Sequence, residues 1–298
     1  ENSHAGWLST YYVYDDLGQL RSIITPKAVK YLESTGWVFV STEVYQELCF
    51  WYEFDEREKK KKKHSPGAGE IHLIFDKKDR LVLSQDQNQR NRLSKQWSFY
   101  LYDKFDRAIV TGLFDNNNSR ELMASHINSL NNGVVSISVY VGVNETISAD
   151  NPVAGNSSYC NACSNTVINS VQYYDGYNYP GVKSFNTGYS FASSSDPDVE
   201  PTQTSPRTTG FVTGSKTRVI DQNYDDGNPY NDIFLIATSY YDDKGRVIQE
   251  LSDNIKSAVD YSTIQYNYAG RTLSVCDKHT MPGTSVTSFE TISKLEYD

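Results

Sequence analysis

The sequence contains no apolar run near the roughly 18 residues that a membrane-spanning helix requires, so we expect no membrane span. It also lacks an excess of positive charge: 28 Lys and Arg stand against 37 Asp and Glu, giving a net charge of -9. Domains that bind nucleic acid carry a basic surface, so we expect no nucleic-acid partner. Four Cys in 298 residues are too few for a small domain held together by disulfides.

Tyrosine, in contrast, is abundant. The chain has 23 Tyr but only 2 Met, and its mean hydropathy is -0.58. Tyr suits strands whose surface is half buried, because the ring packs while the hydroxyl stays in contact with water. This composition favours β-structure with a large exposed surface.

A short motif recurs along the chain: an aromatic residue, an Asp, two further residues, a Gly or Asp, and then a strand. One copy reads YYVYDDLGQL from Tyr11 to Leu20, and another reads TSYYDDKGRVI from Thr238 to Ile248. Other copies, some degraded, begin at Phe54, Phe75, Tyr102 and Tyr266, and Tyr297-Asp298 matches the first two letters of the motif.

Each copy predicts a β-hairpin. The Asp begins a tight turn, because its side chain can accept hydrogen bonds from the backbone amides just ahead of it. A Gly or Asp three residues later tolerates the left-handed backbone that closes a type I hairpin turn. One hairpin cannot bury its own apolar face, so we expect neighbouring hairpins to pair edge to edge in one antiparallel sheet. The expected left-handed residues are Gly18, Asp79, Asp106, Gly245 and Gly270.

The copies divide the sequence into three parts. Repeat hairpins are expected over 1–114 and 233–298, with an insertion over 115–232 between them. The insertion is expected to hold a helix at about 119–131, a strand at 134–141 and a mobile loop, rich in Ser, Pro and Asp, at about 189–210.

The helix at about 119–131 has Ser119 as its N-cap. Its apolar residues at helical spacing are Leu122, Met123, Ile127 and Leu130. Two further elements are expected: a second short helix that starts at Pro26, and a degraded repeat at Val171–Gly176.

The repeated motif, with the phrases that link its copies, resembles the RHS repeat, also called the YD repeat, of Bacteroidetes-type bacteria. The resemblance reaches both ends of the chain and is weakest over Gly142–Pro206. The stretches that carry it are Phe75–Asp86, Trp97–Gly112, Val212–Val219 and Tyr240–Asp253.

This resemblance implies a fold and a function. In that family the hairpins form a long antiparallel sheet that spirals into a hollow shell around a variable C-terminal toxin. We therefore expect a mainly β, curved or spiral array of YD hairpins with one or two short helices in insertions. The chain would be shell wall of a secreted or cell-surface bacterial protein.

The resemblance also bears on partners and catalysis. The expected partners are the remainder of the same RHS chain and its toxin cargo. The sequence stops at Asp298 without the family's self-cleaving core segment, so we expect neither a catalytic residue nor a cofactor.

Cys160 and Cys163 form a CxxC pair. A structural zinc site needs four ligands, usually two such pairs or one pair and His. The other Cys are distant and no His lies nearby, so we expect a local disulfide or two free thiols rather than a metal site.

Asp221, Asn223 and Asp225 place oxygen ligands at alternate positions, as calcium loops do. The glycine, Gly227, comes one place late, and the last ligand position holds Asp232 in place of Glu. A solvated turn is the favoured interpretation, and no metal site is assigned.

The remaining charged and aromatic residues suggest alternatives. The basic run Lys59–Lys63 is interpreted as part of an outgoing strand whose charge discourages edge pairing. No His lies in a nucleophile or zinc-protease pattern, and His126 is expected to pack beside the helix. Exposed aromatic rings stack on sugars, so the alternative function is a carbohydrate- or partner-binding sheet. A third is an enzyme whose carboxylates meet only in the fold.

Overall fold

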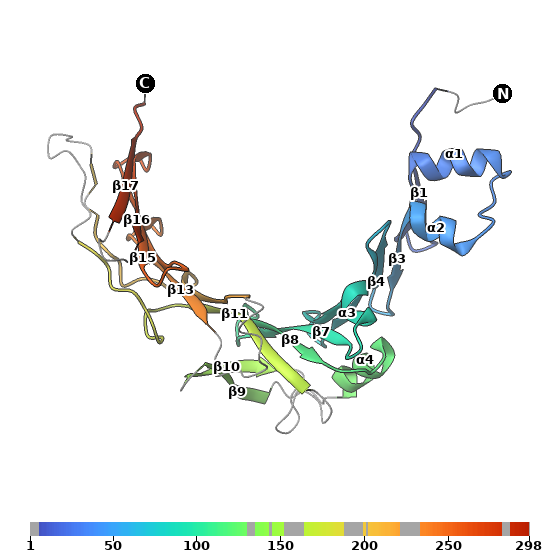
Figure 1. The fold of residues 1–298 in the computed structure, drawn as a ribbon, viewed down its shortest axis with the longest axis horizontal. Helices are drawn as coiled ribbons and strands as arrows, with labels where there is room; N and C mark the ends of the chain where they lie inside the picture. Colours follow the sequence, from blue (N-terminus) through green and yellow to red (C-terminus); the bar gives the residue numbers. More distant parts are fainter. Residues whose placement is uncertain are drawn as a thin grey trace. The chain divides into compact units, whose positions relative to one another are not determined.

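A computed structural model describes residues 6–129, 135–142, 145–151, 164–187, 199–200, 202–220, 233–281 and 287–297 of the chain. The protein is mainly β, as expected: antiparallel strands follow one another along the sequence, and the helices between them are short (Figure 1). The chain divides into two compact units, described in turn below. The first comprises Glu1–Arg107, Gly112–Ile137 and Ser148–Val167, and the second comprises Ala108–Thr111, Ser138–Ile147 and Ile168–Asp298.

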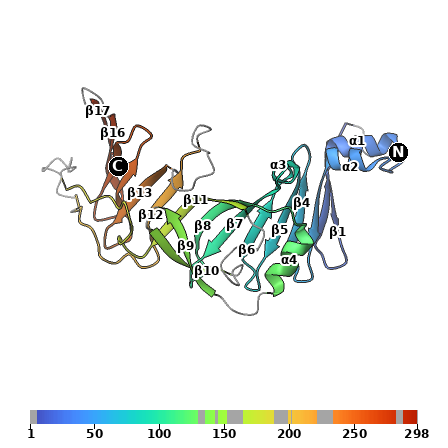
Figure 2. The ribbon, with the colours of Figure 1, turned by 60° about the horizontal axis from the view of Figure 1, so that its bottom comes forward.

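The strands of the first unit form a ladder in which each strand pairs antiparallel with the next in sequence, from β1 to β7. Figure 2 shows these strands side by side in chain order. This is the pairing that a row of hairpins predicts. The strands are β1 (Tyr11–Tyr14), β2 (Leu20–Ile24), β3 (Cys49–Phe54), β4 (Lys60–Ser65), β5 (Gly69–Phe75), β6 (Leu81–Gln85) and β7 (Gln96–Tyr102).

The strands after β7 span the boundary between the two units. They are β8 (Ala108–Asp115), β9 (Val135–Gly142) and β10 (Glu145–Asn151). The strand expected at 134–141 is thereby confirmed as β9, and β10 pairs with β7 through Asp150 and Tyr102.

One face of the first unit is packed. In β7 the side chains of Trp97, Phe99 and Leu101 are fully buried and alternate with half-buried neighbours, as a strand with one core face requires. Helix α4 (Arg120–Ser129) contacts β5 and buries Met123 and Ile127. Its start at Ser119 is confirmed by hydrogen bonds from the Leu122 and Met123 amides to Ser119 Oγ and its carbonyl.

Three other helices connect strands of the first unit. The expected helix at Pro26 is confirmed as α1 (Pro26–Ser34), with Thr25 as its N-cap and Pro at the first position. Helices α2 (Thr42–Leu48) and α3 (Gln87–Asn91) were not predicted. Both are brief, and α3 is held by a capping box between Asp86 and Gln89.

The prediction for the apolar side of α4 is wrong at Leu122, which is 60% exposed. Met123 and Ile127, four residues apart, are the buried residues of the described helix, and Leu130, also expected on this side, lies outside the described residues. His126 is half-buried beside Ile127, so its packing role is in keeping with the expectation.

The second unit continues with strands that again pair antiparallel in sequence order, from β11 to β17. They are β11 (Ser164–Tyr174), β12 (Val212–Arg218), β13 (Phe234–Tyr241), β14 (Val247–Asp253), β15 (Val259–Tyr266), β16 (Thr272–Met281) and β17 (Thr287–Lys294).

Residues 177–187 form a strap without regular secondary structure over the second unit. The Tyr179 hydroxyl donates to the Thr213 carbonyl at 3.0 Å and contacts the Thr238 hydroxyl at 2.9 Å. The Tyr240 hydroxyl donates to the Lys183 carbonyl at 2.6 Å. Because these contacts reach β12 and β13, the strap covers the sheet and helps to bury a core formed by Tyr240, Ile248 and Leu251.

Candidate functional site

The turn at Asp76 has the geometry that the motif predicts. The amides of Lys78 and Arg80 both donate to Asp76 Oδ1 at 2.9 Å. The Asp79 amide donates to the Asp76 carbonyl at 3.1 Å, and Asp79 has a φ of 62°. One carboxylate oxygen is therefore used entirely to hold the turn.

The same turn recurs at the other motif copies that the structure describes. In each, the third residue after the Asp or Asn has a positive φ and donates its amide to the carbonyl of that Asp or Asn. The degraded copy at Asp55 follows the rule as well, with Glu58 at a φ of 61°. The left-handed residues are Gly18, Glu58, Asp79, Asp106, Gly245 and Gly270, which confirms all five that the sequence predicted.

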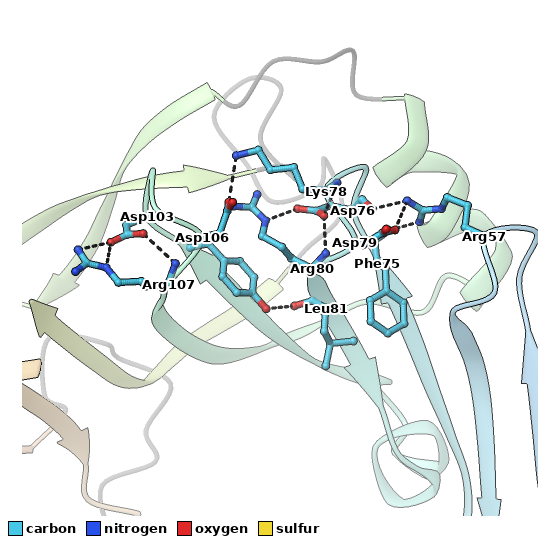
Figure 3. A network of polar contacts seen from close by, with 11 residues as sticks. Arg57, Phe75, Asp76, Lys78, Asp79, Arg80, Leu81, Asp103, Asp106 and Arg107 are labelled. Carbon is cyan, nitrogen blue, oxygen red and sulfur yellow. Dashed lines mark hydrogen bonds and ion pairs between the residues drawn. The ribbon is translucent and has the colours of Figure 1, made fainter. Parts of the chain in front are cut away.

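The second carboxylate oxygen binds an arginine. Arg80 Nε donates to Asp76 Oδ2 at 2.8 Å, and both side chains are buried (Figure 3). Arg107 makes the equivalent bond to Asp103 at 2.6 Å. Both arginines come four residues after their Asp, so each turn carries an internal charge-assisted bond. Arg246 binds Asp242 in the same way. Arg21, which comes six residues after Asp15 and not four, binds the Asp15 carboxylate.

The motif tyrosines that follow an earlier copy tie their own turn to the preceding one. The Tyr102 hydroxyl donates at 2.7 Å to the carbonyl of Leu81, which is the fifth residue after Asp76. Tyr266 donates in the same way to Val247, five residues after Asp242. The same bond joins Tyr174 to Ala108, Tyr241 to Val212, and Tyr297 to Thr272.

At several junctions the arginine of one turn stacks on the aromatic residue of the next copy. Arg80 lies 4.8 Å from the centre of the Tyr102 ring, and Arg246 lies 4.4 Å from that of Tyr266. Such contacts between a cation and an aromatic face contribute about 0.5–1 kcal/mol at exposed sites and more when desolvated. The same stacking joins Arg21 to Phe54 and Arg271 to Tyr297.

The strand register is the same at each of these junctions. We call the strand before a motif Asp incoming and the strand after its turn outgoing. The seventh residue after one Asp pairs with the fourth residue before the next, as Leu83 pairs with Phe99. This constant register explains why the Tyr–carbonyl bond and the Arg–Tyr stacking recur. The other pairs that follow this count are Ser22–Trp51, Lys62–His72, Gln249–Thr263 and Ser274–Lys294. Gly214–Thr238 is the corresponding pair after the longer connection that follows Asp175.

Ion pairs also cross between turns. Asp106 Oδ1 accepts from Lys78 Nζ at 3.1 Å and from Arg80 Nη1 at 2.6 Å. The hydrogen bond from Lys78 and the positive charge of Arg80 lower the pKa of the Asp106 carboxyl. Arg57 similarly binds Asp79 at 3.0 Å. An Asp at the left-handed position is strained relative to Gly, but here it gains a partner in the preceding turn.

Two turns were missed or only partly recognised in the sequence. Asn254 starts a turn of the same kind, with Ser257 at a φ of 62° and with both Lys256 and Ala258 amides donating to Asn254 Oδ1. The Asn in place of Asp and the Ser in place of Gly hid it, although both types are common in turns.

The candidate repeat at Val171–Gly176 is a hairpin opened by an insertion. The Asp175 amide donates to the carbonyl of Phe211, and Tyr174 pairs with Val212. The chain between these residues replaces the three-residue connection of the other copies, such as Lys77–Asp79 between Asp76 and Arg80. A degraded repeat was therefore a sound interpretation of this stretch.

The loop expected at about 189–210 lies partly outside the described residues. Its described part contacts the neighbouring turns: Glu200 binds Arg246 at 2.6 Å and Lys244 at 2.9 Å. The Ser205 amide donates to the Tyr241 carbonyl, and the Thr208 hydroxyl donates to the Asp175 carbonyl. Glu200 and residues 202–210 thus contact the turns at Asp175 and Asp242. The mobility of the loop stays a prediction.

The metal-site candidates from the sequence lie outside the described residues. This holds for Cys160 and Cys163 and for Asp221, Asn223 and Asp225. Within the ranges given above, no group of three or more His, Cys, Asp or Glu side chains could hold a metal ion. In the same ranges, no helix is long and apolar enough to cross a membrane.

The explanation of Lys59–Lys63 as protection of an exposed edge is wrong. Strand β4, which holds most of the run, pairs with β3 on one side and with β5 on the other. The lysines instead face acidic neighbours: Lys61 lies 3.4 Å from Glu53, and Lys59 lies 3.4 Å from Asp79. The run therefore balances charge within the sheet.

Cys49 and Cys276 are buried free thiols. Burial raises the pKa of each to about 11, and the thiolate is the reactive form. In a Cys160→Ser, Cys163→Ser variant we expect both thiols to resist a disulfide reagent near pH 8 and to react after unfolding. Rapid labelling of either thiol in the folded chain would contradict this prediction.

Two hollows in the second unit contain few ionisable groups. One is lined by residues that include Lys183, Phe185 and Tyr261, and the other by residues that include Phe234 and Asp253. Lys183 and Asp253 bind each other at 2.6 Å. Neither hollow brings together two carboxylates or a nucleophile and a base. The repeated turns are therefore the main polar feature that these residues build.

No family model matches the chain, and no curated protein matches it either. It is similar to a crystal structure of TcdB2-TccC3-Cdc42 and to a Photorhabdus luminescens Tc holotoxin pore with a mutation in TccC3. Each is 12% identical, with a TM-score of 0.43. A crystal structure of TcdB2-TccC3 is 11% identical with the same TM-score. These matches cover 97% of this chain and 11% of the other, so the chain spans about a tenth of their length.

Proposed function

We propose that this chain is a structural segment of a bacterial RHS-repeat protein. In this role it contributes wall to a β-sheet shell that encloses or presents a C-terminal toxin, and it performs no catalysis itself. Its partners are the remainder of the same protein and the toxin cargo, and the protein is secreted or held at the cell surface. The YD motifs support the family, and the turns support the structural role.

One observation carries the structural role: the carboxylates of the motif aspartates, which would be the candidate catalytic acids, are engaged in holding their own turns. Asp76 and Asp242 each use one oxygen for backbone amides and the other for arginine. A catalytic carboxylate needs an oxygen within reach of substrate. The motif tyrosines and arginines link neighbouring copies of the turn, and nearest-neighbour contacts of this kind stabilise repeat proteins.

The same contacts argue against glycan binding by the motif tyrosines. Tyr102, Tyr241 and Tyr266 donate their hydroxyls to backbone carbonyls, and arginines stack on two of the rings. A ring already covered by a guanidinium offers less surface to a sugar. The carbohydrate-binding alternative is therefore less well supported than the structural role.

Electron microscopy of the full-length protein tests the proposal. We expect a closed wall with a lumen, in which the repeats of this chain form consecutive strands. The matched measurement is limited proteolysis, in which an enclosed toxin resists digestion until the wall is unfolded. An open sheet without a lumen, together with a toxin digested at once, contradicts the shell.

A further inference from the structure

The strap of the second unit is bound through its backbone at two positions. The Lys183 amide donates to the Thr238 hydroxyl at 3.1 Å, and the Lys183 carbonyl accepts from the Tyr240 hydroxyl at 2.6 Å. Three residues later, the Asn186 amide donates to Gln249 Oε1 at 2.8 Å, and its carbonyl accepts from Gln249 Nε2 at 3.1 Å. Side chains of the sheet thus bind both backbone groups of each residue, and such contacts do not depend on the residue type.

The side chains that make these bonds are buried in the sheet. Thr238 and Gln249 are both 0% exposed, and Tyr240 is 9% exposed. A buried amide or hydroxyl costs free energy when it is left without a hydrogen-bond partner. Gln249 Oε1 and the Tyr240 hydroxyl both bond to the strap backbone. This part of the sheet therefore favours a state in which a polypeptide backbone covers it.

Two side chains of the strap anchor it to the same strands. Lys183 Nζ lies 2.6 Å from Asp253 Oδ1, and the Lys183 side chain is 14% exposed. Two residues later, the Phe185 ring packs edge-on against the Tyr240 ring, with the ring centres 5.3 Å apart. Ser184, between them, is exposed. These contacts select a basic residue and, two positions later, an aromatic residue, and they leave the residue between them free to vary.

The strap leaves part of the surface on which it lies uncovered. A hollow of about 410 Å³ is lined by strap residues, among them Phe185 and Asn186, and by Leu251, Val259 and Tyr261 of the sheet. Well-packed interiors leave little unfilled space. The strap has no regular secondary structure either. It therefore lies on the sheet as a bound peptide does, with space left at its side.

We propose that Thr238, Tyr240, Gln249 and Asp253 form a binding site for polypeptide segments that present a basic residue and, two positions later, an aromatic residue. The strap is the resident occupant of this site. It acts as an intramolecular competitor, because a tethered segment has a high effective concentration. A segment of another polypeptide binds when the strap leaves the site, and the second unit then holds that polypeptide in addition to its structural role.

A peptide from the strap provides the probe. It is the fluorescently labelled segment Gly181–Thr187, and its receptor is the full chain with Lys183→Ala and Phe185→Ala, which we call the anchor-free chain. By fluorescence anisotropy we expect saturable binding to the anchor-free chain and at least tenfold weaker binding to the unaltered chain, whose own strap competes. Absent binding to the folded anchor-free chain would overturn the proposal. Equal affinity for both chains would also overturn it, because the peptide would then bind elsewhere.

Changes in the peptide separate anchor positions from free ones. Phe185→Ala in the peptide should weaken binding roughly tenfold, and Lys183→Ala should weaken it roughly threefold at low salt and less at high salt. Val182→Ala and Ser184→Ala alter exposed side chains and should leave the affinity within about twofold. Methylation of the Asn186 nitrogen removes the bond to Gln249 and should weaken binding roughly fivefold. Equal effects at anchor and exposed positions would contradict the site.

Two neighbouring tyrosines of β13 provide a matched pair of variants in the anchor-free chain. Tyr240→Phe removes the hydroxyl that binds the backbone carbonyl at position 183 and should weaken peptide binding roughly fivefold. Tyr241→Phe removes a hydroxyl that donates to the Val212 carbonyl and should leave peptide binding unchanged. If both variants weaken binding equally, the loss reflects general destabilisation and the site is rejected.

The test remains decisive if the anchor-free chain is unfolded by itself. A ligand that binds the folded state alone stabilises it, so saturating peptide should then restore the circular dichroism spectrum of the unaltered chain. The peptide with Phe185→Ala should restore it less at the same concentration. No recovery with either peptide would overturn the proposal.

Discussion

Asp76→Ala is expected to lower the free energy of unfolding of the first unit by about 3–5 kcal/mol. The Asp76 side chain is buried, and its two oxygens accept from the Lys78 and Arg80 amides and from Arg80 Nε. Removal of the carboxylate leaves two turn amides without their acceptor. Among the described residues, it also leaves Asp106 as the one remaining anionic partner of the buried Arg80 guanidinium.

The measurement is urea unfolding followed by circular dichroism. Asp76→Asn is the matched variant, because Asn254 and Asn267 show that an amide oxygen can hold the same turn. We expect Asp76→Asn to recover about half of the loss, since it restores the turn bonds but not the charge. A loss below about 1 kcal/mol for Asp76→Ala would show that the turn contributes little to stability.

Gly214→Ala is expected to destabilise the second unit by about 3 kcal/mol through overpacking and a lost hydrogen bond. A Cβ at Gly214 would lie 2.1 Å from the Tyr179 hydroxyl oxygen and 2.9 Å from the Ala237 carbonyl oxygen. Tyr179 is buried and held by Thr213 and Thr238, so its ring cannot move aside without losing those bonds. Burial raises the pKa of Tyr179 to about 12, as expected for a phenol out of contact with water.

Gly176→Ala is the matched control, because a Cβ at Gly176 meets no atom within 4 Å. It should change stability by less than about 0.5 kcal/mol. A near-ultraviolet circular dichroism spectrum, which reports on buried tyrosines, should change for Gly214→Ala and not for Gly176→Ala. Equal stability of the two variants would mean that the strap is not packed against β12.

The local rules of the turn were predictable because they act within a few residues. The side chain of Asp76 reaches only the amides just ahead of it, and Asp79 must take a left-handed backbone. Both requirements restrict the residue type directly, so they leave a visible pattern. The antiparallel ladder then follows, because hairpins that cannot bury a face alone have to pair.

The connections between turns were not predictable. The bond from Tyr102 to Leu81 joins residues 21 apart, and an arginine four places after an Asp could equally have faced water. A backbone carbonyl accepts from any donor, so Leu81 itself carries no signal. Helices α2 and α3 escaped notice because each is under eight residues long and shows too little periodicity.

The sequence by itself determined the hairpin, because turn chemistry is local and each copy restates it in Asp, Gly and an aromatic residue. Only the tertiary structure decided what those residues do for one another. It placed Arg80 between Asp76 and Tyr102, and it set the strap of residues 177–187 across Gly214. The physical reason is that these contacts depend on which strands are neighbours and on the register of their pairing. Both are set by the assembled sheet and not by the local sequence.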